Sequence, residues 1–113
     1  MTLDARDSPS IQRLLQRLPE FRPTFEQFVK EEDGEFGSFW AMNELGRWTF
    51  PQDDRELLRR VFAAVDEVYT DQSLRDGNDL AIEFFEAVCD AGQERFDAYI
   101  GSTSREWFDQ HGW

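Results

Sequence analysis

The sequence predicts an all-α protein: one compact domain of about six short helices in antiparallel hairpins, arranged as a bundle or a HEAT-like stack. Apolar residues recur at helical spacing almost throughout, no segment alternates at period two for long enough to indicate a sheet, and brief polar turns separate the periodic segments. With 113 residues, 40% of them hydrophobic, the chain can bury a core without disulfides or a structural metal. We read residues 1–113 as a single helical domain, with residues 1–7 as a flexible N-terminal tail.

Three helices are expected in the first half of the chain. Ser8 followed by Pro9 predicts a first helix, because a hydroxyl can cap the first free N–H groups and proline suits the first helical position. Its apolar face is formed by Ile11, Leu14, Leu15 and Leu18. A second helix should open at Pro23 and end near Gly34, which suits a left-handed C-terminal cap. A third should occupy residues 37–50, since the proline that follows disfavours further helix.

The second half of the chain predicts further helices. Asp53 and Glu56 have the spacing of a capping box before a fourth helix. The apolar stripe of that helix consists of Leu57, Leu58, Val61, Phe62, Val65, Val68 and Tyr69. Asn78 can cap a fifth helix, with Ala81, Phe84, Phe85, Val88 and Cys89 on one face. Residues 96–100 indicate a sixth helix, and Thr103 opens a last short one.

The charge balance is strongly acidic. Twenty-four Asp and Glu residues against twelve Lys and Arg residues give a net charge of -12 and a pI near 4.3. Such a surface repels phosphate groups, so direct binding to nucleic acid or to an anionic membrane is disfavoured. A partner with a basic surface is favoured, because complementary charge raises the association rate. The alternative is that the acidic surface only keeps the protein soluble.

Cysteine usage and the N-terminus predict a cytoplasmic protein. Cys89 is the single cysteine, which excludes an intramolecular disulfide and a cysteine-rich metal site. The segment MTLDARDSPS has neither the basic region nor the apolar region of a secretory signal. No apolar run approaches the ~18 residues that a membrane span needs.

The sequence offers no catalytic machinery, and we expect neither an enzyme nor a cofactor. His111 is the single histidine and lies at the C-terminus, so Ser-His-Asp, Cys-His and two-histidine metal arrangements have no base or ligand. No glycine-rich phosphate loop and no Gly-x-Ser-x-Gly turn is present. Cys89 falls on the apolar stripe, where a thiol behaves as a small hydrophobic group.

Two acidic clusters and one arginine are the candidate partner-binding residues. One cluster follows the second helix, at Glu31, Glu32, Asp33 and Glu35. The other forms a stripe on the fifth helix opposite its apolar face, at Asp79, Glu83, Glu86 and Asp90. The stripe has three interpretations: a solvated helix face, a surface that meets a basic partner, and a cation site. The cation site is the weakest, because the histidine-containing ligand pairs of di-iron bundles are missing.

The segment FWAMNELGRWTF, residues 39–50, is the richest aromatic stretch. On a helical wheel Phe39, Trp40, Asn43, Arg47 and Phe50 fall broadly together, while Met42, Leu45 and Trp48 lie elsewhere. An element that is apolar on several sides is expected to be packed by several neighbours, so its Phe and Trp side chains are predicted to form the hub of the core. The alternative is a surface groove in which Trp and Arg anchor a partner.

The segments LLQRLPEF, MNELGRW, NDLAIEFFEAV and FDAYIG occur in this order over roughly residues 11 to 101. Together they resemble a family of small, acidic, helical bacterial proteins that are regarded as immunity proteins of polymorphic toxin systems. The resemblance implies an inhibitor that is held in the cytoplasm and occludes a cognate toxin. It implies no catalytic residues.

Three functional hypotheses follow. The first is a non-enzymatic immunity protein that binds a toxin domain through an acidic surface, and a nuclease fits well because its groove must be basic. The second is an acidic adaptor, or a regulator that mimics nucleic acid, bound to a basic protein. The third is a small hydrolase that uses carboxylates and a divalent ion.

Overall fold

A computed structural model describes residues 5–31, 37–91 and 96–110. These ranges contain six α-helices, and none of their residues forms a β-strand, so the all-α prediction is confirmed. The helices are α1 (Pro9–Arg17), α2 (Arg22–Glu31), α3 (Ser38–Thr49), α4 (Arg55–Thr70), α5 (Gly77–Ala91) and α7 (Ser102–Gln110). Single 3-10 turns occur at η1 (Ala5–Asp7), η2 (Pro19–Phe21) and η3 (Asp97–Tyr99).

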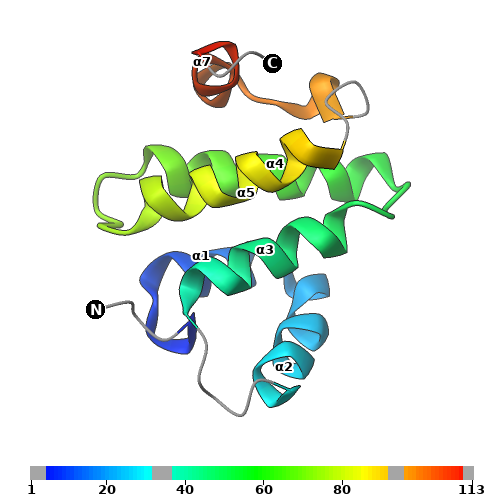
Figure 1. Cartoon of the computed structure of the whole chain (residues 1–113), viewed down its shortest axis with the longest axis vertical. Coiled ribbons are helices and arrows are strands. Elements are labelled where there is room, and N and C mark those ends of the chain that lie inside the picture. The colour runs from blue at the N-terminus through cyan, green and yellow to red at the C-terminus, as the bar shows by residue number, and fades with distance from the viewer. Residues whose placement is uncertain (1–4, 32–36, 92–95, 111–113) are drawn as a thin grey trace.

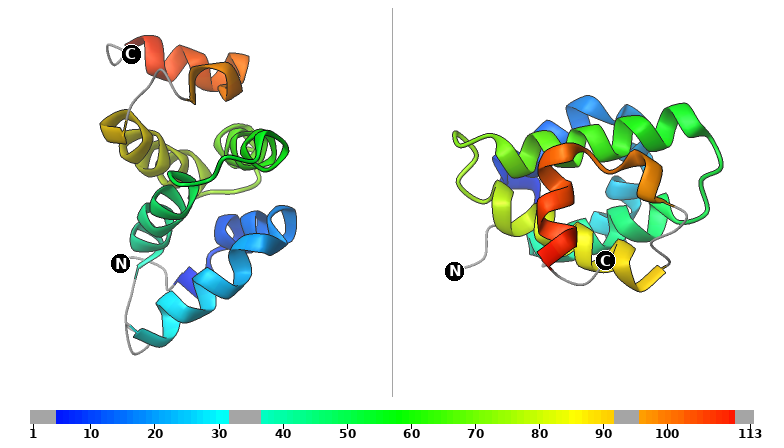
Figure 2. Two further views of the ribbon diagram at one scale, coloured as in Figure 1. Left: turned by 90° about the vertical axis from the view of Figure 1, so that its right-hand side faces the viewer. Right: turned by 90° about the horizontal axis from the view of Figure 1, so that it is seen from above.

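The α4–α5 pair is an antiparallel hairpin at the centre of the molecule (Figure 1). On one side of the hairpin, α1 packs against α4 and α3 packs against α5, while α2 lies farther out against α3. On the opposite side, α7 covers the hairpin (Figure 2). As a result α3 and α5, which are not consecutive in the chain, lie side by side and run in the same direction.

Helix starts follow the capping residues, with two corrections to the sequence prediction. The Ser8 side chain accepts a hydrogen bond from the Ile11 N–H, as expected. The cap of α4 is Asp54, not Asp53. The Asp54 Oδ1 accepts hydrogen bonds from the N–H groups of Glu56 and Leu57, at 2.9 and 3.2 Å. Asn78 is not a cap, because α5 already begins at Gly77.

Gly77 explains this early start of α5. A Cβ atom at this position would lie 2.2 Å from the carbonyl oxygen of Val68, so the turn between α4 and α5 closes only around a residue without a side chain. The close approach lets α5 begin directly beside the last turns of α4.

Aromatic rings fill the core between the hairpin and its neighbours. Phe84 is fully buried, and its ring meets the ring of Phe62 edge-on at 5.5 Å. Phe85 contacts Phe108 of α7 at 5.0 Å, which fixes the C-terminal helix on the hairpin. Phe21 contacts the half-buried Trp48 at 5.3 Å and so joins η2 to α3.

The two ends of the described chain differ from simple helices. Of the expected tail, residues 5–7 form the turn η1, which packs against α1 and α3. The segment 96–100, expected to be helical, contains the single turn η3. The start of α7 is fixed by Asp66 of α4, whose Oδ1 accepts from the N–H and the hydroxyl of Ser104 at 3.2 and 2.6 Å.

None of the described helices is both long and apolar enough to cross a membrane.

Candidate partner-binding surface

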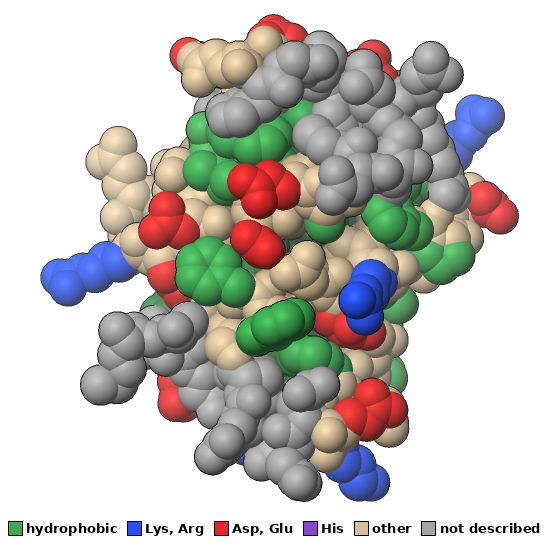
Figure 3. Space-filling view, viewed as in Figure 1, with side chains coloured by type: hydrophobic (Ala, Val, Ile, Leu, Met, Phe, Trp, Pro, Cys, Tyr) green, Lys and Arg blue, Asp and Glu red, His purple; other side chains and the backbone are tan. Residues whose placement is uncertain are grey.

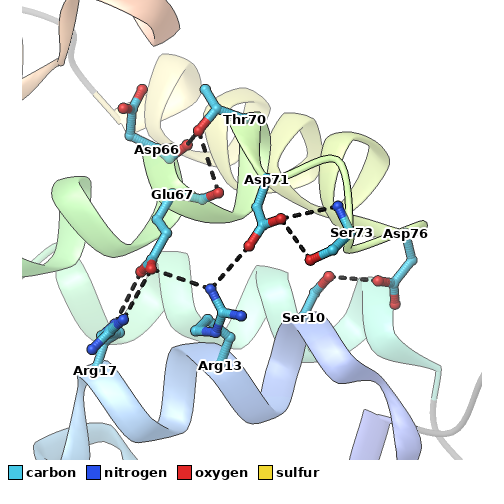
Figure 4. A network of polar contacts seen from close by, with 9 residues as sticks. All are labelled: Ser10, Arg13, Arg17, Asp66, Glu67, Thr70, Asp71, Ser73 and Asp76. Atoms are coloured by element: carbon cyan, nitrogen blue, oxygen red, sulfur yellow. Dashed lines mark hydrogen bonds and ion pairs between the residues drawn. The ribbon is translucent and has the colours of Figure 1, made fainter.

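Two acidic residues at the contact between α1 and α4, Glu67 and Asp71, are paired with arginine. Arg13 donates to both Glu67 and Asp71 at 3.1 Å, and Arg17 donates to Glu67 at 3.0 Å (Figure 4). The hydrogen bond from Arg17 is the main reason why the pKa of Glu67 falls below its ordinary value. These ion pairs join α1 to α4 and leave little free charge between them.

Two further carboxylates, Glu20 and Asp76, have hydrogen-bond partners. Glu20 pairs with Arg60, which lowers the pKa of Glu20. Asp76 accepts hydrogen bonds from the hydroxyls of Ser8 and Ser10. An open hollow of about 270 Å³ lies beside these contacts, but its charged lining residues, Arg17, Arg60 and Glu67, are the same paired groups. It therefore offers no free charge with which to hold a ligand.

The acidic stripe of α5 contrasts with this arrangement. Asp79 and Glu86 are exposed and Glu83 is half-buried, and none of the three forms an ion pair with a described residue. The fourth member, Asp90, belongs to α5 by its backbone, but its side chain lies outside the described residues. Because α5 contains no Lys or Arg, no side chain of the helix itself offsets the negative charges of Asp79, Glu83 and Glu86.

Beside this stripe α3 exposes two large aromatic side chains. Phe39 is 40% exposed and Trp40 is 64% exposed, although both were predicted to belong to the core. The prediction holds for the opposite side of α3, where Met42 and Leu45 are buried. The physical reason is that α3 has only one buried face: α5 and α2 flank it, and the remaining face is open.

The contacts between α3 and α5 set the register of the two helices. The Asn43 Nδ2 donates to Glu83 Oε1 at 2.9 Å. One turn later, a Cβ atom on Gly46 would lie 3.0 Å from the Cβ of Ala87, so the helices approach closely there. Since both contacts advance in the same direction, the first turn of α3 lies beside the first turn of α5.

We call the exposed and half-buried residues of this region the α3–α5 surface. Its members are Phe39, Trp40, Asn43 and Arg47 of α3 with Asp79, Glu83 and Glu86 of α5. Figure 3 shows hydrophobic side chains next to acidic ones over these two helices, with a basic group at one end. The structure thus brings Arg47, which is exposed, onto the same surface as the acidic stripe.

The other predicted cluster does not join this surface in the described residues. Glu31 is exposed at the end of α2, and its Oε1 accepts from Gln27 at 3.0 Å. Glu32, Asp33 and Glu35 lie outside the described residues, as does His111.

The α3–α5 surface presents charged, aromatic and amide side chains. In the described part of the chain, no group of three His, Cys, Asp or Glu side chains is placed to hold a metal ion. The surface combines carboxylates without ion pairs, two aromatic rings and one hydrogen-bonded amide. Such a combination is typical of surfaces that contact proteins with cationic and apolar groups, because Trp is enriched among the residues that dominate interface energies and complementary charge raises the association rate.

Sequence reasoning kept the exposure of the Phe39–Phe50 aromatics only as an alternative, a surface groove, and missed the pairing of Asn43 with Glu83. A signal for the first was present: the helical wheel places both aromatics with Asn43 and Arg47, and polar residues mark an exposed face. The pairing had no signal, because it joins residues 40 positions apart.

The comparisons with known proteins identify a family without a described activity. A family model described as "Domain of unknown function (DUF7674)" matches residues 11–113. The comparison with curated proteins and the comparison with solved structures each found no match.

Proposed function

The chain belongs to the domain family DUF7674, whose description assigns no activity, and we propose its function from the α3–α5 surface. The protein is proposed to be a non-enzymatic immunity protein that binds and occludes a bacterial toxin domain. The observation that carries this proposal is the acidic stripe of Asp79, Glu83 and Glu86 beside exposed aromatic rings. The choice of a toxin as the partner rests on the sequence resemblance.

The proposed mechanism of inhibition is electrostatic competition for the toxin's substrate groove. A toxin that acts on nucleic acid holds phosphates in a basic groove, and an acidic surface of matching size competes for that groove. Long-range attraction would raise the association rate, and the apolar rings would add contact area that salt does not screen. Inhibition is then a matter of occupying the groove and requires no reaction.

The test is to mix the protein with the toxin domain encoded beside its gene and to follow complex formation by calorimetry and toxin activity in an enzyme assay. We expect a one-to-one complex that inhibits the toxin and weakens as ionic strength rises. The double variant Glu83→Gln/Glu86→Gln should weaken the complex strongly. Glu106→Gln is the matched control, because Glu106 is an exposed glutamate of α7 outside the α3–α5 surface.

Two results would reject the proposal. One is the absence of a complex at low ionic strength. The other is an equal effect of the two-site variant and the control, which would place the interface elsewhere. Binding to an unrelated basic protein with the same affinity would favour the adaptor hypothesis instead.

A further inference from the structure

Trp40 is the most exposed large apolar side chain of the described residues, at 64%. The other tryptophans that the structure describes are packed: Trp48 is half-buried against Phe21, and Trp107 is 7% exposed. Burial of an apolar ring as large as indole is favourable, so Trp40 on the open face of α3 is available to contact a partner.

Two carboxylates lie near the residues that follow Trp40 on α3. Glu83 lies across the α3–α5 contact, joined through Asn43, which is one turn from Trp40. Glu44 is one turn along α3 in the same direction, and it is half-buried. Neither carboxylate forms an ion pair with a described residue. The face of an aromatic ring is itself electron-rich, so rings and carboxylates together attract a cation.

The hydrogen bond from Asn43 also orients the Glu83 carboxylate. It occupies Oε1 and holds the carboxylate in place, while no described residue bonds Oε2. A fixed carboxylate on the same surface as a flat ring matches the planar guanidinium group, which stacks on aromatic faces and pairs with carboxylates through directed N–H bonds. The ammonium group of lysine also binds ring faces and carboxylates, but as a point charge without the planar fork that stacks and pairs at once.

We propose that the α3–α5 surface takes an exposed arginine side chain of the partner protein, stacked on Trp40 and paired with Glu83. This inference deepens the proposed function and rests on it for the identity of the partner. It does not depend on Asp79, whose place in the first turn of α5 is also explained by the positive end of that helix dipole.

Arg47 determines at which end of the α3–α5 surface the partner's arginine binds. This exposed residue lies two turns after Trp40 on the same face of α3 and repels a second cation at that end. The incoming arginine is therefore expected between Trp40 and α5, not over the C-terminal end of α3.

The experiment titrates the whole protein with two probes, a capped hexa-arginine peptide and a capped hexa-lysine peptide, at low ionic strength by calorimetry. We expect the arginine peptide to bind about 3- to 10-fold more tightly, because only its groups stack on the ring. Trp40→Leu keeps an apolar side chain but removes the ring, and should bring this ratio close to one. Glu83→Gln should weaken the arginine peptide more than Glu106→Gln does.

An equal affinity of the two peptides for the wild-type protein, or an unchanged ratio in Trp40→Leu, would overturn the inference. Circular dichroism must show that the variants keep the helical content of the wild type; Trp40→Phe, which keeps a smaller ring, should retain part of the ratio and gives a second measure. The toxin assay separates the two proposals. A salt-sensitive toxin complex that Trp40→Leu leaves unchanged rejects this inference alone, whereas a ring-dependent arginine preference without a toxin complex rejects the proposed function alone.

Discussion

Asn43 and Glu83, 40 positions apart in the chain, are joined by a hydrogen bond of 2.9 Å that ties α3 to α5 in a parallel register. This bond sets the exposed rings of α3 beside the acidic stripe of α5. It is therefore both a structural contact and the basis of the α3–α5 surface.

Replacing Asn43 by alanine removes the bond to Glu83 and a longer bond of 3.4 Å to the Phe39 carbonyl oxygen. The free energy of unfolding should fall by about 0.5 to 1.5 kcal/mol, the usual net value of a hydrogen bond. Urea denaturation measures the change. Asn78→Ala is the control: it makes the same substitution at an exposed helical position where no side-chain bond is present in the described residues. Equal effects of the two variants would mean that the bond to Glu83 contributes nothing to stability.

Gly77→Ala should destabilise the protein by about 1 to 3 kcal/mol or more, because the added Cβ would lie 2.2 Å from the Val68 carbonyl oxygen and force the α4–α5 turn apart. Gly46→Ala should cost less, since its Cβ would meet only the Cβ of Ala87 at 3.0 Å and alanine favours a helix. Thermal melting of both variants gives the comparison. The reverse order would contradict the packing of the turn.

Phe84→Ala should cost about 3 to 5 kcal/mol, because the ring is fully buried against Phe62 and leaves a cavity. A loss of this size is a large part of the ~5 to 15 kcal/mol that stabilises a typical domain, so the variant should be largely unfolded on mild heating. Phe39→Ala makes the same change on the open face of α3 and should cost about 1 kcal/mol or less. Chemical denaturation of the pair tests which phenylalanines form the core.

Acidification should weaken the α1–α4 ion pairs. The hydrogen bond from Arg17 lowers the pKa of Glu67 in the folded protein below the ordinary value of 4.5. A lowered pKa means that the ionised group stabilises the fold at pH values above 4.5, and that this contribution is lost as the pH falls below that value. Wild type should therefore lose stability between pH ~5 and ~3 more steeply than Glu67→Gln.

The control for this pH series is Glu106→Gln, which changes the net charge equally but removes no described ion pair. It should follow the wild-type curve in urea denaturation. A wild-type curve parallel to that of Glu67→Gln would show that the Arg17 contact does not bias the titration of Glu67. The relief of repulsion in a chain of net charge -12 on acidification is common to all three proteins and cancels in the comparison.

Removing the positive charge of Arg47 should strengthen binding of a basic partner. Arg47→Ala is expected to raise the association rate a few-fold at low ionic strength and to have little effect at high ionic strength, because the charge acts at long range. Stopped-flow mixing with the toxin domain measures the rate. Arg55→Ala, an exposed arginine at the start of α4, is the charge-matched control. Slower association of the Arg47 variant would mean that this arginine contacts the partner favourably.

The sequence by itself determined the helices. Ser8 and Pro9 mark the start of α1, Gly37 precedes α3, and the apolar stripe of α4 is the buried face of that helix. Helical spacing is a local property, because residues three and four apart share a face whatever the rest of the chain does. The same locality explains the small errors at Asp53 and Asn78, where neighbouring residues compete for the cap.

Only the tertiary structure decided which faces stay open. The stretch around Phe39 and Trp40 contains enough apolar residues to be core, and its exposure depends on where α2 and α5 lie. The sequence also does not show which acidic residues form ion pairs. Glu67 pairs with Arg17, whereas Glu83 accepts a hydrogen bond from the Asn43 amide and forms no ion pair with a described residue. Charge and hydrophobicity are properties of single residues and can be read from the sequence. A surface is formed by residues of different helices, and helix packing determines which of those residues lie next to one another.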